Sequence, residues 1–267
     1  MTSMYKTTEA RSVTALRVEE TKPTRRQQLI IELIESAKQA LPMVLIQAGQ
    51  IAMTTTDVAL ISRLGAKSLA AAALAGRIHL VSFTFGVGFL TPIVPVVAEA
   101  IGANNLSVAR RSLRMGLWAA VLLSLPIMIF ALNGERMLLA FSQASNTARL
   151  AQQYLFGLAW SVAPALCFHV IRGFAGAVNR PSSIMWITLS ALPINALLVY
   201  LLIYGKLGLP RLELLGAGVA TTLVNCGMVS ASLCFSIMRQ PLRRYHLLAK
   251  FWRFEWSMMG LLSQPLP

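Results

Sequence analysis

The sequence predicts an all-α membrane protein that crosses the bilayer several times, and three observations carry this prediction. Of the 267 residues, 56% are hydrophobic and only 13% are charged, which lies well outside the range of soluble domains. Apolar stretches of roughly 20 residues, the length that a helix needs to cross a bilayer, recur along the chain. Lys and Arg gather unevenly between these stretches, as expected when successive loops lie on opposite sides of a membrane.

Six stretches are predicted to be transmembrane helices. The second is long enough to be tilted or bent, and Pro92 and Pro95 near its end can cause a bend. A soluble protein can bury one such helix in its core, but six in succession exclude a soluble fold. The predicted spans cover residues 41–62, 69–97, 115–133, 150–171, 184–204 and 214–238.

The distribution of charge orients these helices. The net charge is +14, and seventeen of the 24 Lys and Arg residues fall in four segments that share one side of the membrane if the N-terminus is cytoplasmic. The positive-inside rule therefore predicts that both termini are cytoplasmic. Basic segments next to the bilayer are expected to contact anionic lipids, so the charge requires no nucleic-acid partner. The four segments are residues 1–40, 98–114, 172–183 and 239–256.

The chain is predicted to divide into four parts. Residues 1–37 form a flexible cytoplasmic tail that ends in a short interfacial helix near RRQQLIIELIESAKQ. The six-helix transmembrane lobe covers 38–238, and a basic cytoplasmic segment covers 239–256. Residues 257–267, SMMGLLSQPLP, are expected to be the truncated start of a seventh helix.

Patterns typical of enzymes are missing from the sequence. It holds no phosphate-binding loop, no dinucleotide fingerprint and no His–Glu cluster, and its three histidines stand far apart. Cys167, Cys226 and Cys234 all fall in predicted spans, where free cysteines behave as small buried hydrophobic residues. We therefore expect neither an enzyme nor a metal or organic cofactor. A transporter needs less, namely a cavity, one titratable group and helices able to change their packing.

Asp57 is the only aspartate of the chain and stands inside the first predicted span. A charged group at that depth costs roughly 2.5–3.5 kcal/mol on insertion scales, so it normally faces a protein interior or a water-filled cavity. Gln47, Gln50, Thr54 and Asp57 recur at helical spacing and line one face. For the glutamines and Thr54, a polar seam bonded to neighbouring helices and a cavity lining both remain open.

Arg77, in the second predicted span, is a candidate ion-pair partner for Asp57. At 1.5 Å per residue, Asp57 lies about 9 Å and Arg77 roughly 12 Å below the outer boundary, on consecutive antiparallel helices. An ion pair would hold the carboxylate ionised and oppose its protonation. If Arg77 instead extends to the outer interface, Asp57 is free to bind a proton near physiological pH. We expect the second arrangement.

Four motifs follow one another in the order found in a known family of exporters. They are LPMVLIQAGQIAMTTTDVALISRLGAKSLAAAALAG, FGVGFLTPIVPVVAEAIGANN, IRGFAGAVNRPSSIMW and LPINALLVYLLIYGKLGLPRLELLGAGVATTLVN. Over about residues 38–267 the chain resembles the N-terminal half of the multidrug and toxic compound extrusion (MATE) family, nearest its bacterial NorM-like branch. The resemblance implies one six-helix lobe of a proton-coupled antiporter that exports amphipathic organic cations across the bacterial inner membrane.

The resemblance also implies roles for single residues. Asp57 would take up the proton, Asn195 would hydrogen-bond near its carboxylate, and the threonine of the sixth helix corresponds to Thr221 or Thr222. Some relatives carry a second acid where this chain has Val199, which would leave Asp57 as the sole titratable carboxylate of the lobe. The implied coupling ion is H⁺ rather than Na⁺, because the second lobe, where some relatives place a cation site, would be absent.

Members of the MATE family contain two homologous lobes that rock against each other, whereas this sequence accounts for one. Three alternatives follow. The chain is an incomplete, half-length part of an efflux transporter, or a half-size protein that works as a homodimer, or a non-transporting remnant that acts as a membrane interaction partner. For the cargo, a lipid-linked carrier is the alternative to organic cations.

Overall fold

The computed structural model describes residues 25–140, 144–178, 181–206, 208 and 210–238, and all regular elements within these ranges are α-helices. The chain divides into two units, Met1–Leu41 and Pro42–Pro267. The described residues of the first unit belong to the beginning of α2 (Arg25–Ser62), at the place of the predicted interfacial helix. The predicted tail before residue 25, the basic segment 239–256 and the start of a seventh helix lie outside the described residues.

Helices occupy all six stretches that the sequence predicts to span a membrane. By length and composition, four helical spans of the described chain qualify as membrane-crossing, and a bent pair of helices makes a fifth. The stretch 41–62 lies within α2, so the predicted count of six holds approximately. The helices after α2 are α3 (Ala66–Leu90), α4 (Ile93–Gly102), α5 (Leu106–Leu132), α6 (Gly134–Ala140), α7 (Ser145–Ala159), α8 (Val162–Ala177), α9 (Ser182–Tyr204) and α10 (Glu213–Met238).

The second predicted span is interrupted where its prolines stand. α3 ends at Leu90 and α4 begins at Ile93, with Pro92 between them. Thr91 and Pro92 keep helical dihedral angles, but proline has no backbone N–H to donate to the preceding turn, which explains the interruption. The helix is therefore interrupted at one of the two prolines at which the sequence predicts a bend.

The fourth predicted span, 150–171, consists of two helices rather than one. α7 and α8 meet at 48°, around Trp160 and Ser161. Pro164 lies in the first turn of α8, where its missing N–H leaves no helical hydrogen bond unmade. α8 also continues to Ala177, six residues beyond the predicted end. Arg172, which the sequence analysis places in an inner loop, is therefore part of a helix.

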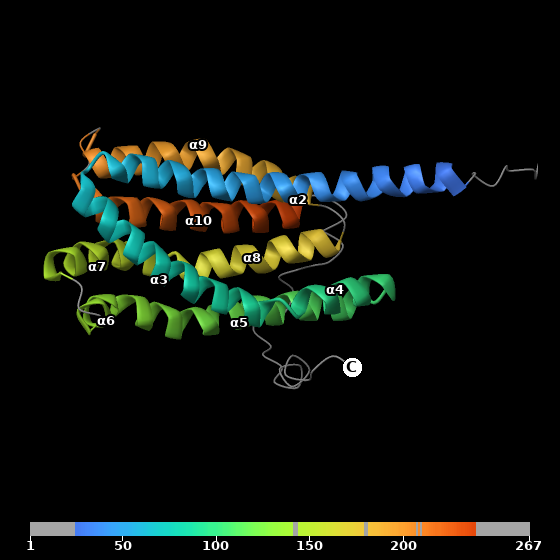
Figure 1. Ribbon diagram of the computed structural model, residues 1–267. Helices are drawn as coiled ribbons and strands as arrows, with labels where there is room; N and C mark the ends of the chain where they lie inside the picture. The colour runs from blue at the N-terminus through green and yellow to red at the C-terminus, as the bar shows by residue number, and fades with distance from the viewer. Residues whose placement is uncertain (1–24, 141–143, 179–180, 207, 209, 239–267) are drawn as a thin grey trace, which may run out of the picture. The chain divides into compact units, whose positions relative to one another are not determined.

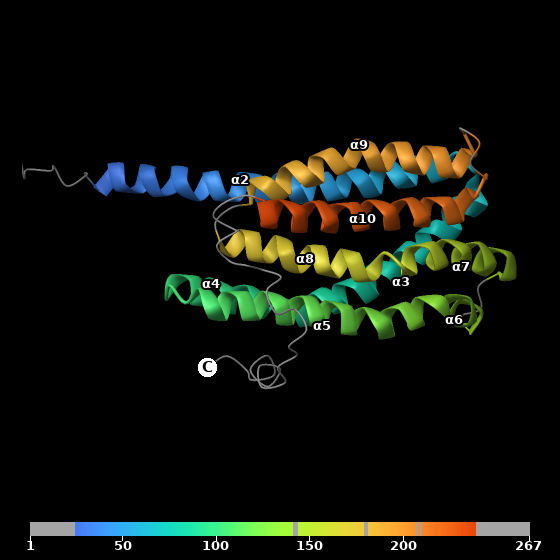
Figure 2. The same ribbon diagram turned by 180° about the vertical axis from the view of Figure 1, so that it is seen from behind.

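Within the second unit, α10 packs against α7, α8 and α9. Figures 1 and 2 show α9 and α10 running side by side, with α8 on the other side of α10. α7 and α10 cross at backbone contact, because a Cβ atom added to Gly157 would lie 2.9 Å from the Cα of Gly218. Such close approach is typical of glycine-lined contacts between membrane helices. It brings the first turns of α10 against α7.

Candidate functional site

Asp57 is buried in the second half of α2, and only 7% of its surface is exposed. The three residues before it, Thr54, Thr55 and Thr56, donate their hydroxyl hydrogens to α2 carbonyl oxygens four residues earlier. These threonines therefore need no partner on another helix. A carboxylate cannot donate such a bond when ionised, so the partners that stabilise Asp57 come from other helices.

Asn195, in the middle of α9, provides the shortest contact to this carboxylate. Its Nδ2 donates to Oδ1 of Asp57 at 2.6 Å, and the asparagine side chain is completely buried. Oδ1 of Asn195 is buried and has no hydrogen-bond partner within the described part of the chain. Because an amide carries both donors and an acceptor, Asn195 can donate to an ionised Asp57 and, after rotation, accept from a protonated one.

Thr221 and Thr222 of α10 have different environments. The Thr221 hydroxyl lies 3.5 Å from Oδ2 of Asp57 and 3.0 Å from the carbonyl oxygen of Ala217. The Thr222 hydroxyl instead donates to the carbonyl oxygen of Gly157 at 2.7 Å, across the crossing with α7. Of the two positions left open by the sequence, the structure places Thr221 beside the carboxylate, while Thr222 joins two helices.

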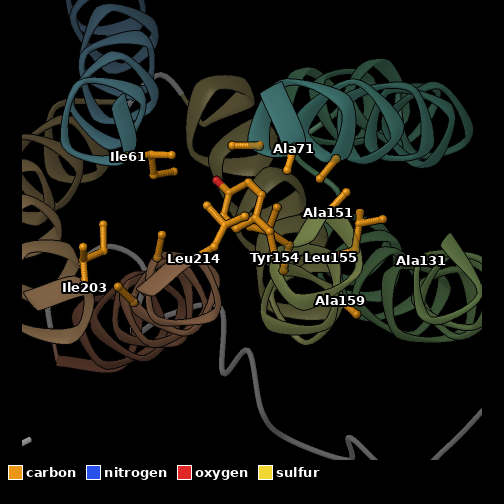
Figure 3. Close-up of a cluster of buried hydrophobic side chains, with 14 of the residues drawn as sticks. Ile61, Ala71, Ala131, Ala151, Tyr154, Leu155, Ala159, Ile203 and Leu214 are labelled. Carbon is orange, nitrogen blue, oxygen red and sulfur yellow. The ribbon is translucent and has the colours of Figure 1, made fainter. Parts of the chain in front are cut away.

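Tyr154 of α7 is a further polar residue in this region, and the sequence analysis did not single it out. Figure 3 shows its ring among Ile61 of α2, Ala71 of α3 and Leu214 of α10. The carboxylate of Asp57 is near enough to act electrostatically on the phenol. A tyrosine in an apolar helix usually belongs to the core, so the sequence alone contained no signal for this neighbour.

A second polar group lies nearer the middle of α2 and is called here the arginine cluster, made of Gln47, Gln50 and Arg172. Nη1 of Arg172, on α8, donates to Oε1 of Gln50 at 3.0 Å and to Oε1 of Gln47 at 3.5 Å. The two glutamines therefore hydrogen-bond to a neighbouring helix, one of the two alternatives left open. Thr54 is exposed and takes no part in either polar group.

Arg77 is exposed on α3 and makes no ion pair with Asp57 in the described part of the chain. The contacts of the carboxylate go to Asn195 and Thr221 instead. Val199, one turn after Asn195 on α9, is completely buried among apolar residues. Asp57 therefore contributes the carboxylate of this site without a second acid from α9.

The structure thus brings Asp57, Asn195 and Thr221 together and separates them from Arg77, Thr54 and Thr222. Sequence reasoning missed Arg172 because the predicted fourth span stopped at residue 171. A buried carboxylate held by a fully buried amide can bind and release a proton, or form an ion pair with an organic cation. An apolar groove of about 710 Å³ between α3, α5 and α6 is lined by no titratable side chain, so it has no part in such chemistry.

Comparison with known proteins connects this site to a family. A family model named MatE matches residues 42–201, which includes Asp57, Arg172 and Asn195. The chain is 52% identical, over 231 residues, to a protein of Bradyrhizobium diazoefficiens named "Probable multidrug resistance protein NorM", covering 86% of this chain and 50% of that protein. A protein of the same name from Rhodopseudomonas palustris is 47% identical and is covered to 49%. The chain spans about half the length of these relatives.

Solved structures agree on the fold. The eukaryotic MATE transporter AtDTX14 superposes with a TM-score of 0.78 at 16% identity, covering 87% of this chain and 51% of that one. A MATE family transporter in an outward-facing conformation gives a TM-score of 0.69 at 20% identity, with coverages of 85% and 50%. Apolar membrane-length helices, the matched family model and these similarities make the protein a multi-pass membrane protein. The chain belongs to the MatE family.

Proposed function

We propose that this chain is one lobe of a multidrug efflux transporter that exchanges organic cations for protons. The observation that carries the proposal is the hydrogen bond of 2.6 Å between the buried Asn195 and Asp57, the only aspartate of the sequence. A carboxylate at this depth has a high cost in free energy. No Lys or Arg of the described chain forms an ion pair with it, which a purely structural role would not explain. The names of the NorM relatives support the transport of multiple drugs.

In this proposal Asp57 binds either a proton or the cationic group of the substrate, but not both. Asn195 stabilises each state with a different atom of its amide, and Thr221 adds a weaker donor at 3.5 Å. Competition of two positive ligands for one carboxylate is the simplest way to couple their opposite movements. Proton entry from one side of the membrane would then displace the organic cation.

The proposal also includes the surroundings of the lobe. The protein lies in the bacterial inner membrane with both termini in the cytoplasm, as the distribution of Lys and Arg indicates. It works with a second lobe, either from the same gene product or from a second copy, because alternating access requires two halves. H⁺, rather than Na⁺, is the coupling ion, and no organic cofactor takes part.

Transport by the native-length gene product in liposomes tests the proposal. An imposed pH gradient should drive movement of ethidium, and Asp57→Asn should abolish the gradient-driven movement. Thr54→Val on the same helix is the matched control, because Thr54 is exposed and bonds only within α2. Equal transport by Asp57→Asn and the unchanged protein would contradict the proposal, as would a folded protein that moves ethidium in neither form.

A further inference from the structure

The arginine cluster contains a positive charge that the proposed function does not use. Arg172 is half-buried on α8 and is bound by the neutral amide oxygens of Gln47 and Gln50. No carboxylate of the described chain lies within ion-pair distance of its guanidinium. Neutral amides orient a guanidinium but leave its charge uncompensated, and uncompensated charges within membrane helices mark ligand sites by default.

The guanidinium has donors left for a ligand. Arginine carries five N–H groups in a planar fork, and the hydrogen bonds to Gln47 and Gln50 both come from Nη1. None of the nitrogen atoms of Arg172 is among the buried atoms without a partner. Nε and Nη2, which make no hydrogen bond within the described chain, are therefore not fully buried, and they can bind a carboxylate or phosphate through two parallel hydrogen bonds.

The guanidinium of Arg172 lies deeper in the membrane than that of an arginine at the membrane–water interface. Gln50 is twelve residues before the end of α2 at Ser62, about 18 Å along the helix axis. The hydrocarbon core of a bilayer is about 30 Å thick, so the guanidinium is held near the level of its middle. An anionic group bound there would be shielded from water, which strengthens its interaction with the arginine.

The position of Arg172 relative to Asp57 indicates what kind of molecule would use it. Gln50 and Asp57 are seven residues apart, which is two helical turns on the same face of α2 and about 10 Å of rise. The carboxylate of Asp57 on α2 and the uncompensated guanidinium of Arg172, which α8 holds against Gln50, thus both lie beside this face of α2. His169, one turn before Arg172 on α8, is half-buried and interacts electrostatically with it, and it adds no negative charge.

We propose that Arg172 is a specificity-determining residue that binds an anionic group of the substrate, so that the lobe favours dipolar amphiphiles carrying a cation for Asp57 and a carboxylate or phosphate for Arg172. The inference rests on the proposed function for the cationic end and adds the class of molecule. Gln47 and Gln50 act as positioning residues, because their amide oxygens orient the guanidinium of Arg172 and do not neutralise its charge.

A matched pair of dyes tests this assignment. Rhodamine 19 carries a carboxylate, and rhodamine 6G is its ethyl ester, so the two differ in the anionic group alone. Their binding to the purified chain in phosphatidylcholine nanodiscs is measured by fluorescence anisotropy, with empty nanodiscs subtracted. Arg172→Gln should weaken rhodamine 19 at least tenfold and change rhodamine 6G by less than twofold. Arg77→Gln, which removes an exposed arginine from α3, is the control and should change neither.

Two further variants keep the test decisive. Gln50→Glu keeps Arg172 and replaces the amide oxygen 3.0 Å from its guanidinium by a carboxylate, which neutralises the charge. This variant tests the role of Arg172 even if Arg172→Gln fails to fold. It should weaken rhodamine 19 at least tenfold while rhodamine 6G stays within twofold. Equal effects on both dyes, or no effect on either, would overturn the role of Arg172. Asp57→Asn should weaken both dyes; if it weakens neither while the arginine variants discriminate, the proposed function fails and the anion site stands.

Discussion

The side-chain amide of Asn195 in α9 lies 2.6 Å from the carboxylate of Asp57 in α2, which joins two helices separated by 138 residues of sequence. The contact is the shortest that Asp57 makes within the described chain, and both side chains are buried. Hydrogen bonds to an ionised group are roughly twice as strong as neutral ones. The pair therefore fixes the relative position of α2 and α9 while Asp57 is ionised.

Asn195→Ala should destabilise the folded chain by about 1.5–3 kcal/mol, because it removes the donor from a buried carboxylate. Ser190→Ala on the same helix is the control, since Ser190 is exposed and donates only to the carbonyl oxygen of Ile187. Its effect should stay within about 0.5 kcal/mol. Unfolding of the purified chain in mixed detergent micelles measures both. Equal stabilities of the two variants would show that the contact between Asn195 and Asp57 contributes nothing.

Thr221→Val and Thr222→Val should have different consequences. Thr222→Val breaks the bond of 2.7 Å to Gly157 across the helix crossing and should lower stability by about 0.6 kcal/mol, with an upper bound near 1.7. Thr221→Val removes a donor at 3.5 Å from Asp57, so it should alter pH-driven ethidium transport more than stability. Measuring transport and unfolding for both variants tests this split. A reversed pattern would mean that Thr222 faces the carboxylate.

Gly157→Ala should lower stability by roughly 1–3 kcal/mol, the usual cost of overpacking. A Cβ atom there would lie 2.9 Å from the backbone of α10, which leaves no flexible side chain to move aside. Gly227→Ala on α10 is the control, because nothing lies within 4 Å of its added Cβ, and alanine favours a helix over glycine. Thermal unfolding should separate the two, and similar midpoints would argue against a tight crossing of α7 and α10.

Arg77→Gln should leave the proton coupling of Asp57 unchanged, because Arg77 is exposed and does not contact the carboxylate. The pH dependence of ethidium transport by the native-length gene product measures this. A shift of that dependence on loss of Arg77 would indicate that the two charges meet in another conformation of the transporter. Lys67→Gln, which removes an exposed cation from the first turn of the same helix, distinguishes a specific contact from a general effect of surface charge.

The sequence predicted the helical membrane fold and the place of Asp57 because hydropathy and the cost of a buried charge act locally. It could not choose between Thr221 and Thr222, since that choice depends on how α10 rotates against α7 at Gly157 and Gly218. The sequence analysis also misplaced Arg172, because the fourth span was defined by apolar length and ended at residue 171. The bond from Arg172 to Gln50 joins positions 122 residues apart, which no local pattern reveals. Tyr154 was missed for a similar reason, as only packing brings it near Asp57.

Proton release on binding of an organic cation tests the central claim, that Asp57 is the group for which proton and cation compete. Ethidium is added to the purified chain in weakly buffered solution, released protons are measured with a pH-sensitive dye, and bound ethidium is measured by anisotropy in the same sample. At a pH at which Asp57 is protonated, we expect about one proton to be released per bound cation, and none from Asp57→Asn. Equal release per bound ethidium from Asp57→Asn and the unchanged chain would contradict it.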